Sequence, residues 1–335
     1  MSWLARFWPE ERIALLFFAG VAAVFASLRY PFTVWLLVLS YLQFLLAITA
    51  FVLPPWLVVF AVRKLRGRAP AGRAVLGELV TFARALAALL VVLVAYTNLK
   101  CRLLLIHPRL FDRILGHVDD LLHRGGGDFV AWVTSFHSPS RTAVLQLVYY
   151  YAWAALTLPL AVAMARSGVS LVRRTLAALA LCYIAGGFLY LALPTLGPAL
   201  VERGRYAGLA GSNIFALQQS MLQALRYIVQ NPQAPAVPFF GLAAFPSLHL
   251  ATSSLGLFVA WKTWRPLLLL LVPWNLAIAA SAVYFGWHYV VDFYPALLLA
   301  WGGWWAAGRL VETTGGTAPA APVSDGNLAG SGSPS

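Results

Sequence analysis

Two short segments in the last third of the chain place histidine near serine or aspartate. Residues 244–251 read Ala-Phe-Pro-Ser-Leu-His-Leu-Ala, and residues 281–292 read Ser-Ala-Val-Tyr-Phe-Gly-Trp-His-Tyr-Val-Val-Asp. His288 and Asp292 are four residues apart, so they share one face of a helix. A neutral imidazole can attack phosphorus, and a carboxylate on its far nitrogen fixes the tautomer and supports the developing positive charge. The second segment therefore predicts nucleophilic catalysis.

The first segment supplies complementary groups. His249 can protonate a departing oxygen and then activate the acceptor, and Ser247 can donate a hydrogen bond to a phosphate oxygen. Two alternatives stay open: a structural His–Asp contact within one helix, and a zinc ion held by His249, His288 and Asp292. The sequence contains no HExxH or other compact ligand cluster, so we expect no metal and no other cofactor.

The apolar composition indicates that both segments belong to a membrane protein. Of the 335 residues, 61% are hydrophobic and 10% are charged, whereas soluble domains are roughly 45–50% apolar and about 25% charged. The formal net charge is +13. Many basic residues lie between apolar runs, where membrane lipids rather than nucleic acids are the expected partners.

The hydropathy pattern predicts an all-α, polytopic fold with about eight transmembrane helices, since about 20 apolar residues cross a bilayer. The candidate spans are residues 12–29, 33–62, 77–98, 142–165, 175–193, 247–262, 266–285 and 288–308. Residues 212–229 predict a further amphipathic helix in the outer loop, at the membrane interface; a helix that caps the active site or holds acyl chains is the alternative. We expect most Trp and Tyr side chains to anchor or pack helices.

Basic residues predict the orientation of these spans. They cluster in the loops after the second, fourth and sixth spans, and such clusters mark the cytoplasmic side. Both termini are then expected in the cytoplasm. The sixth and eighth spans begin together at the extracytoplasmic surface, so His249 and His288 should meet at one depth. The expected location is the plasma membrane.

The two segments together resemble the motifs of the type 2 phosphatidic acid phosphatase superfamily, which also includes the vanadium haloperoxidases. The third family motif is Ser-Arg, five residues, His, three residues, Asp, and Ser281, His288 and Asp292 match it. The second motif, Pro-Ser-Gly-His, is matched by residues 246–249. The resemblance implies His288 as the nucleophile that forms a phosphohistidine, His249 as the acid on the leaving group, and Asp292 as the group that orients His288.

The resemblance covers roughly residues 90–305 and implies a six-helix core, which we assign to the third to eighth spans. The expected organisation is two extra spans and a basic loop in residues 1–75, the catalytic core in residues 76–310, and a tail in residues 311–335. The tail is rich in Gly, Ala, Ser and Pro, which predicts disorder.

The sequence departs from the family pattern where the phosphate should be bound. Leu248 replaces a glycine, and Ala282 replaces the phosphate-binding arginine. The first family motif is Lys, six residues, Arg-Pro, and residues 193–198 hold a proline-rich stretch without a cation in its place. These departures, and residues 95–127, resemble the inositolphosphorylceramide synthase branch, which moves a phosphoinositol head group between lipids.

Other cations must replace the missing arginine, because phosphoryl transfer needs positive groups around the phosphate oxygens. Lys100 ends the third span on the outer side, and Arg203 and Arg205 follow the proline-rich stretch. All three are candidates for binding phosphate. The alternatives are a lysine that extends to the lipid head groups and two solvated loop arginines.

These features predict a membrane-embedded phosphotransferase that moves a phospho-head group, with phosphoinositol as one candidate, from a phospholipid to a lipid alcohol. The first alternative is a phosphatase that hydrolyses a lipid phosphate such as a phosphatidate or a polyprenyl phosphate. It would use the same residues with water as acceptor. A lipid transporter without chemistry should show an inverted repeat, which we do not find, and a structural scaffold is the last alternative.

Overall fold

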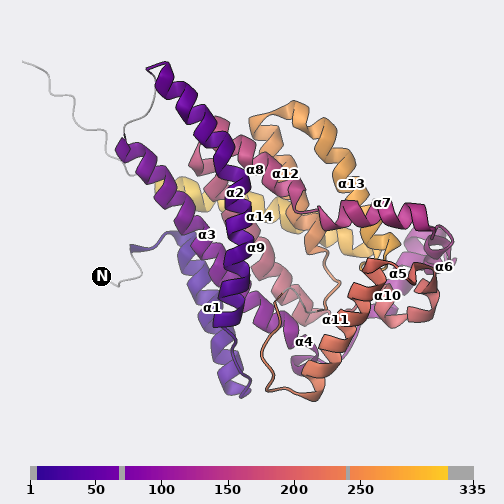
Figure 1. Cartoon of the computed structure of the whole chain (residues 1–335). Helices are drawn as coiled ribbons and strands as arrows, with labels where there is room; N and C mark the ends of the chain where they lie inside the picture. Colours follow the sequence, from indigo (N-terminus) through magenta and orange to yellow (C-terminus); the bar gives the residue numbers. More distant parts are fainter. Residues whose placement is uncertain (1–5, 68–71, 239–241, 316–335) are drawn as a thin grey trace, which may run out of the picture.

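The computed structural model describes residues 6–67, 72–238 and 242–315, and every regular element in these ranges is a helix (Figure 1). The all-α prediction is therefore confirmed. The long helices are α1 (Pro9–Ser27), α2 (Trp35–Leu65), α3 (Gly72–Cys101), α7 (Pro139–Tyr150), α8 (Ala154–Ser167), α9 (Val169–Ala192), α11 (Asn213–Gln230), α12 (Leu248–Thr263), α13 (Leu268–Tyr284) and α14 (Phe293–Gly315).

Within the described ranges, five helices are long and apolar enough to cross a membrane. They are Trp35–Leu65, Gly72–Cys101, Pro139–Ser167, Val169–Ala192 and Arg265–Tyr284. The third of these is interrupted between α7 and α8, and the fifth includes the short helix η3 (Arg265–Leu267) before α13. The structure thus supports a polytopic membrane protein, while the count of eight spans and the six-helix core stay predictions.

Two of the other predicted spans differ from a typical membrane helix, one in its length and one in its charged residues. Helix α12 has 16 residues, which at 1.5 Å per residue reach only about 24 Å. Helix α1 has 19 residues, but its first turn contains Glu10, Glu11 and Arg12. Both helices nevertheless pack into the bundle, α12 against α8 and α14, and α1 against α3.

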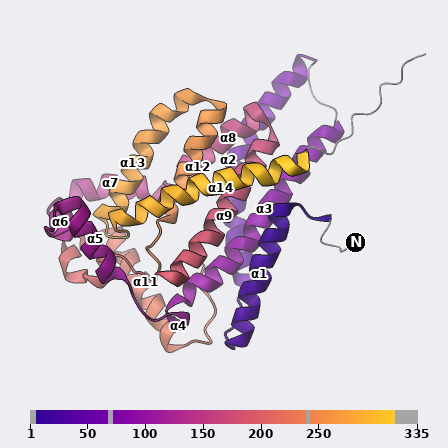
Figure 2. The ribbon, with the colours of Figure 1, turned by 180° about the vertical axis from the view of Figure 1, so that it is seen from behind.

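Helix α9 lies at the centre of the bundle. It packs against α3 on one side and α14 on another, while α8 packs between α2 and α12. Seen from behind, α14 crosses the bundle toward its N-terminal helices (Figure 2). The large apolar core formed by these helices includes Leu89, Leu176 and Leu255, all almost fully buried.

Helix α1 is fixed to this bundle by charged side chains at its start. Glu10 pairs with Arg173 at 2.6 Å, and Glu11 pairs with Arg84 through two bonds of 2.6 and 2.7 Å. The ring of Trp8 lies against both guanidinium groups. The centroid of the ring is 3.7 Å from Cζ of Arg84 and 3.8 Å from Cζ of Arg173. Such cation–π contacts strengthen when they are removed from water. Helix α1 is therefore an integral part of the bundle.

Short helices gather at one end of the molecule, and we call this region the cap. The cap consists of α4 (Leu103–Ile106), α5 (Asp112–Arg124), α6 (Phe129–Thr134), α10 (Pro198–Val201), η2 (Arg203–Leu209) and α11. Figure 1 shows α5, α6, α10 and α11 close together, beyond the ends of the long helices. The predicted amphipathic helix at residues 212–229 corresponds to α11 and belongs to this region.

Side-chain caps set the starts of several helices here. The side chains of Asp128, Ser138, Ser212 and Ser247 each accept a main-chain N–H from the residue three positions later. Ser, Asp and related residues satisfy the unpaired N–H groups at a helix start in this way. The start of α12, which carries His249, is thereby fixed by local sequence.

Helix α14 continues through Gly315, beyond the predicted end of the core at residue 310. The rest of the predicted tail, residues 316–335, and residues 68–71 of the predicted basic loop lie outside the described residues. The division of the chain into two extra spans, a core and a tail stays a prediction.

Candidate active site

His288 lies in the loop between α13 and the short helix η4 (Val290–Asp292) and is 5% exposed. Its Nδ1 is 3.2 Å from Oδ2 of the fully buried Asp292. An ionised carboxylate only accepts, so when Asp292 is ionised Nδ1 carries the proton and Nε2 holds the lone pair. The same Asp292 oxygen accepts the N–H of Tyr289 at 3.0 Å, which fixes the carboxylate. This is the tautomer that attack by Nε2 would require.

The main chain before His288 is held from three directions. The carbonyl oxygen of Tyr284 accepts from His137 Nε2 at 2.9 Å, that of Phe285 from Gln218 Nε2 at 2.7 Å, and that of Gly286 from the N–H of Ala199 at 2.9 Å. The donors come from the α6–α7 loop, α11 and α10, which are far apart in the sequence. Three consecutive carbonyl groups are thus satisfied by the surrounding segments.

Gly286 is required in this loop for two reasons. Its φ angle is +66°, a conformation that residues with a Cβ rarely adopt. A Cβ atom at this position would also lie 2.5 Å from the ring of Tyr206 and 2.8 Å from Ala199. The close packing of the cap against the loop therefore depends on the glycine.

Helix α5 holds the main chain after His288. Asp119 accepts the N–H groups of Val290 and Val291 at 2.7 and 2.9 Å. Asp112 lies two helical turns earlier on the same face of α5. It accepts the N–H groups of Leu196 and Gly197. Burial raises the pKa of both aspartates, while the donated main-chain hydrogen bonds oppose this shift. Sequence reasoning gave neither aspartate a role.

The second histidine approaches the first from another helix. His249 is the second residue of α12, and its ring centroid is 6.3 Å from that of His288 at an interplanar angle of 72°. Ser247 is fully buried, and its hydroxyl accepts the N–H of Leu250 at 3.4 Å. The N–H of Ser247 donates to the carbonyl of Asp292 at 3.3 Å. Ser247 therefore caps α12 and links the two motifs, and it does not line the cavity described next.

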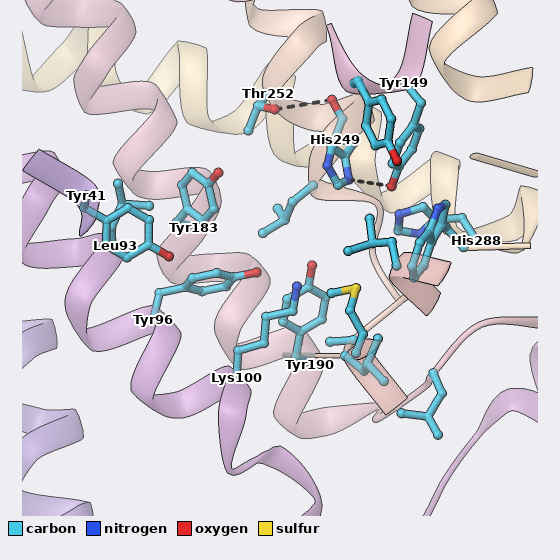
Figure 3. A pocket seen from close by; sticks show the side chains of 18 residues that line it. Tyr41, Leu93, Tyr96, Lys100, Tyr149, Tyr183, Tyr190, His249, Thr252 and His288 are labelled. Atoms are coloured by element: carbon cyan, nitrogen blue, oxygen red, sulfur yellow. Dashed lines mark hydrogen bonds between the residues drawn. The ribbon is translucent and has the colours of Figure 1, made fainter. Parts of the chain in front are cut away.

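A cavity of about 410 Å³ lies in front of both histidines. Lys100 enters it from the end of α3, with its ammonium 5.9 Å from the ring centroid of Tyr96 and 5.6 Å from that of Tyr190 (Figure 3). Among the described residues, Lys100 has no carboxylate within salt-bridge distance. The structure thus brings Lys100, His249 and His288 to one cavity.

Arg203 and Arg205 do not line this cavity. Arg203 donates to Gln219, and Arg205 pairs with Asp128 and Glu202. Their guanidinium groups are engaged within the cap. The structure therefore places two of the three predicted cations away from the histidines.

Six tyrosines line the cavity, a feature that the sequence analysis missed because it assigned most tyrosines to membrane anchoring. They are Tyr41, Tyr96, Tyr149, Tyr150, Tyr183 and Tyr190. A helical spacing was visible in the sequence, since Tyr96 precedes Lys100 by four residues and Tyr183 precedes Tyr190 by seven. Helix α11, for which an interfacial helix was the preferred interpretation and a cover of the active site the alternative, contributes Leu217 and Met221 to the wall.

Two departures from the family motifs have a structural basis. Leu248 occupies space left by Gly186 on α9, where a Cβ atom would lie 2.8 Å from the leucine side chain. The stretch without cations at residues 193–198 is hydrogen-bonded to the start of the first histidine segment. Its Thr195 accepts the N–H groups of Ala244 and Phe245, each at 2.9 Å or less. Structural contacts thus occupy the place of the first motif.

A comparison with protein families gives a match that spans both histidine segments. Residues 117–306, more than half of the chain, match the PAP2 superfamily. The chain belongs to the PAP2 superfamily, and this membership supports lipid-phosphate chemistry of the phosphatase or phosphotransferase type. Comparisons with curated proteins and with solved structures gave no match.

Proposed function

We propose that the chain is a lipid phosphotransferase that moves a phospho-head group from a phospholipid to a lipid alcohol through a phosphohistidine on His288. The observation that carries this proposal is the convergence of His249, His288 and Lys100 on one cavity, with Asp292 behind His288. Phosphoinositol is the head group that the branch resemblance favours.

The roles follow from the chemistry of the side chains. Nε2 of His288 attacks phosphorus, and Asp292 balances the positive charge that develops on the imidazole. His249 protonates the leaving lipid alcohol and later accepts the proton of the incoming one. Lys100 balances the charge on the phosphate oxygens. The step needs no metal or cofactor in this scheme.

The charge of the cavity favours a phosphodiester over a phosphomonoester. Lys100 is the one lysine or arginine among the described lining residues. A diester carries one negative charge, which a single ammonium balances, whereas a monoester carries up to two. The apolar lining residues Leu93, Leu217 and Leu242 also favour a lipid alcohol over water as the acceptor. Hydrolysis of a lipid phosphate uses the same groups and is the alternative.

The proposal includes the orientation of the site. Lys100, at the end of α3, lies beside the histidines, and the basic residues Arg63 and Lys64 end α2, just before α3 begins. Basic clusters mark the cytoplasmic side, so we propose that the termini are cytoplasmic and the cavity is extracytoplasmic, in the plasma membrane.

The test is turnover of a panel of head-group-labelled phospholipids by the purified protein in detergent, with and without an added lipid alcohol. New lipid that requires both the alcohol and His288 supports the transferase and identifies the donor. Free phosphate or head group produced regardless of alcohol, still dependent on His288, supports hydrolysis instead. His117→Ala is the matched control, because His117 is exposed on α5 and does not line the cavity.

Activity of His288→Ala equal to that of the unaltered protein would overturn the site assignment. Lipid movement across vesicles by His288→Ala at full rate, without any new or hydrolysed lipid, would favour a transporter. Both measurements use the same purified protein, so they separate chemistry from transport.

A further inference from the structure

Tyr149, near the end of α7, contacts the ring of His249. Its hydroxyl oxygen is 3.3 Å from His249 Nδ1, and the two ring centroids are 4.9 Å apart (Figure 3). The Tyr149 ring lies nearly parallel to that of Trp287, at 9°, and meets Phe285 edge-on. Trp287 and Phe285 belong to the loop that carries His288. The orientation of the tyrosine is therefore set by both halves of the site.

The two histidines thus have chemically different partners. Nδ1 of His288 faces the carboxylate of Asp292, whereas Nδ1 of His249 faces the neutral hydroxyl of Tyr149. A carboxylate stabilises a positive charge on its imidazole, which suits the nucleophile that becomes cationic when it bonds to phosphorus. A hydroxyl accepts from Nδ1–H without adding a negative charge. His249 therefore remains able to release a proton, as an acid on the leaving group must.

We propose that Tyr149 is a positioning residue that keeps Nδ1 of His249 protonated and directs Nε2 at the exchanging proton. This inference rests on the proposed function. In the first step the Nε2 lone pair of His288 forms the N–P bond. The P–O bond to the leaving alcohol breaks with its electron pair on oxygen, and that oxygen takes the Nε2 proton of the His249 imidazolium.

The second step reverses these roles. His249 is then neutral, with Nδ1–H donated to Tyr149 and a lone pair on Nε2. The acceptor alcohol gives its proton to this nitrogen while its oxygen bonds to phosphorus. The N–P bond breaks, and its electron pair returns to Nε2 of His288. Without the Tyr149 hydroxyl, the neutral imidazole can place its proton on either nitrogen, and one of the two tautomers is inactive.

The test compares two phosphodiesters that share a head group and differ in the leaving group. One is a short-chain phospholipid with a glycerol oxygen as leaving group, and the other is a nitrophenyl ester, whose leaving group departs without a proton. We expect Tyr149→Phe to lower kcat/KM for the phospholipid by about 10-fold to 100-fold, and for the nitrophenyl ester by less than about threefold. The value of kcat/KM reports the transition state for departure of the leaving group.

Three comparisons make the result decisive. Tyr151→Phe removes the same atom from an exposed tyrosine outside the cavity and should leave both values unchanged. His249→Gln should show the same preference for the nitrophenyl ester, with a larger loss on the phospholipid. Phe retains the ring that stacks on Trp287, so Tyr149→Phe should keep the thermal unfolding midpoint of the unaltered protein.

An equal loss on both substrates, or no loss on either, would overturn the role of Tyr149. If His249→Gln shows no dependence on the leaving group, the proposed function itself is wrong, because His249 is then not the acid. If His249→Gln loses kcat/KM for the phospholipid selectively and Tyr149→Phe does not, the role of Tyr149 is refuted while the proposed function stands.

Discussion

Lys100 is the residue on which the charge balance of the cavity depends. Its ammonium lies among tyrosine rings and has no carboxylate partner in the part of the chain that the structure describes. An unpaired cation in a cavity with low polarity interacts strongly with an incoming anion. Binding of the phosphate should therefore rest on this one side chain.

We expect Lys100→Met to lower kcat/KM for phospholipid turnover by about 100-fold, because the charge on the phosphate oxygens is then unbalanced. Lys100→Arg keeps the charge and should lose less. Lys262→Met, at the exposed end of α12, is the control with the same change in charge. A loss below about threefold in Lys100→Met would indicate that Arg203 or Arg205, and not Lys100, balances the charge of the phosphate.

At the scale of residues, the sequence allowed the histidines to be predicted but not their neighbours. The sequence predicted that His288 and Asp292 share one face of a helix, but His288 precedes η4 and Tyr289 after it is extended, so their contact depends on short spacing in the chain and not on helix geometry. The contact between Tyr149 and His249 joins positions 100 residues apart, and no local pattern reports it. Likewise, Ser247 in the motif indicated a phosphate ligand, whereas the structure gives its hydroxyl a capping contact.

At the scale of elements, α5 acts as a support for the loop that carries His288. One face of this helix presents Asp112 to residues 196–197 and Asp119 to residues 290–291. Both carboxylates satisfy main-chain N–H groups that would otherwise be buried without partners. The partners of its two carboxylates come from distant parts of the chain, so no local pattern reports them.

We expect Asp119→Asn to lower kcat by about tenfold with a small change in KM. Each carboxylate oxygen of Asp119 accepts one main-chain N–H, whereas the NH2 group of an amide cannot accept. His288 then loses its fixed position while the cavity remains. Asp128→Asn is the matched control, since Asp128 accepts a main-chain N–H at the start of α6 and does not contact either histidine loop.

Equal effects of the two substitutions on kcat would show that α5 stabilises the cap in general. A fall in the thermal midpoint of Asp119→Asn without a fall in kcat would lead to the same conclusion. A fall in kcat confined to Asp119→Asn supports its role in positioning the loop.

At the scale of the whole molecule, the N-terminal helices belong to the same packed unit as the site. Helix α2 contributes Tyr41 to the cavity, and the Tyr41 hydroxyl is hydrogen-bonded to Thr97 on α3. Helix α1 is held by the Glu10–Arg173 pair, which is almost fully buried. Hydropathy predicted two additional membrane helices, but it could not show that α2 contributes to the wall of the cavity.

We expect Glu10→Ala to destabilise the protein by about 3 kcal/mol, because it removes the carboxylate that pairs with the buried Arg173 guanidinium. The measurement is the thermal unfolding midpoint in detergent. The double variant Glu10→Ala with Arg173→Ala should recover part of this loss, since the buried guanidinium is then removed together with the carboxylate. A double variant less stable than Glu10→Ala alone would contradict this account.

The three bound carbonyl groups before His288 also have a consequence for protein engineering. A His-x-x-x-Asp sequence placed at the start of an unrelated helix would reproduce the spacing, but not the donors His137, Gln218 and the N–H of Ala199. The His-x-x-x-Asp motif alone would therefore not keep its geometry in another protein. The smallest unit that could be transplanted with its geometry intact includes the α6–α7 loop and segments from α10 and α11, so new specificities are more readily built by altering the cavity walls of this scaffold.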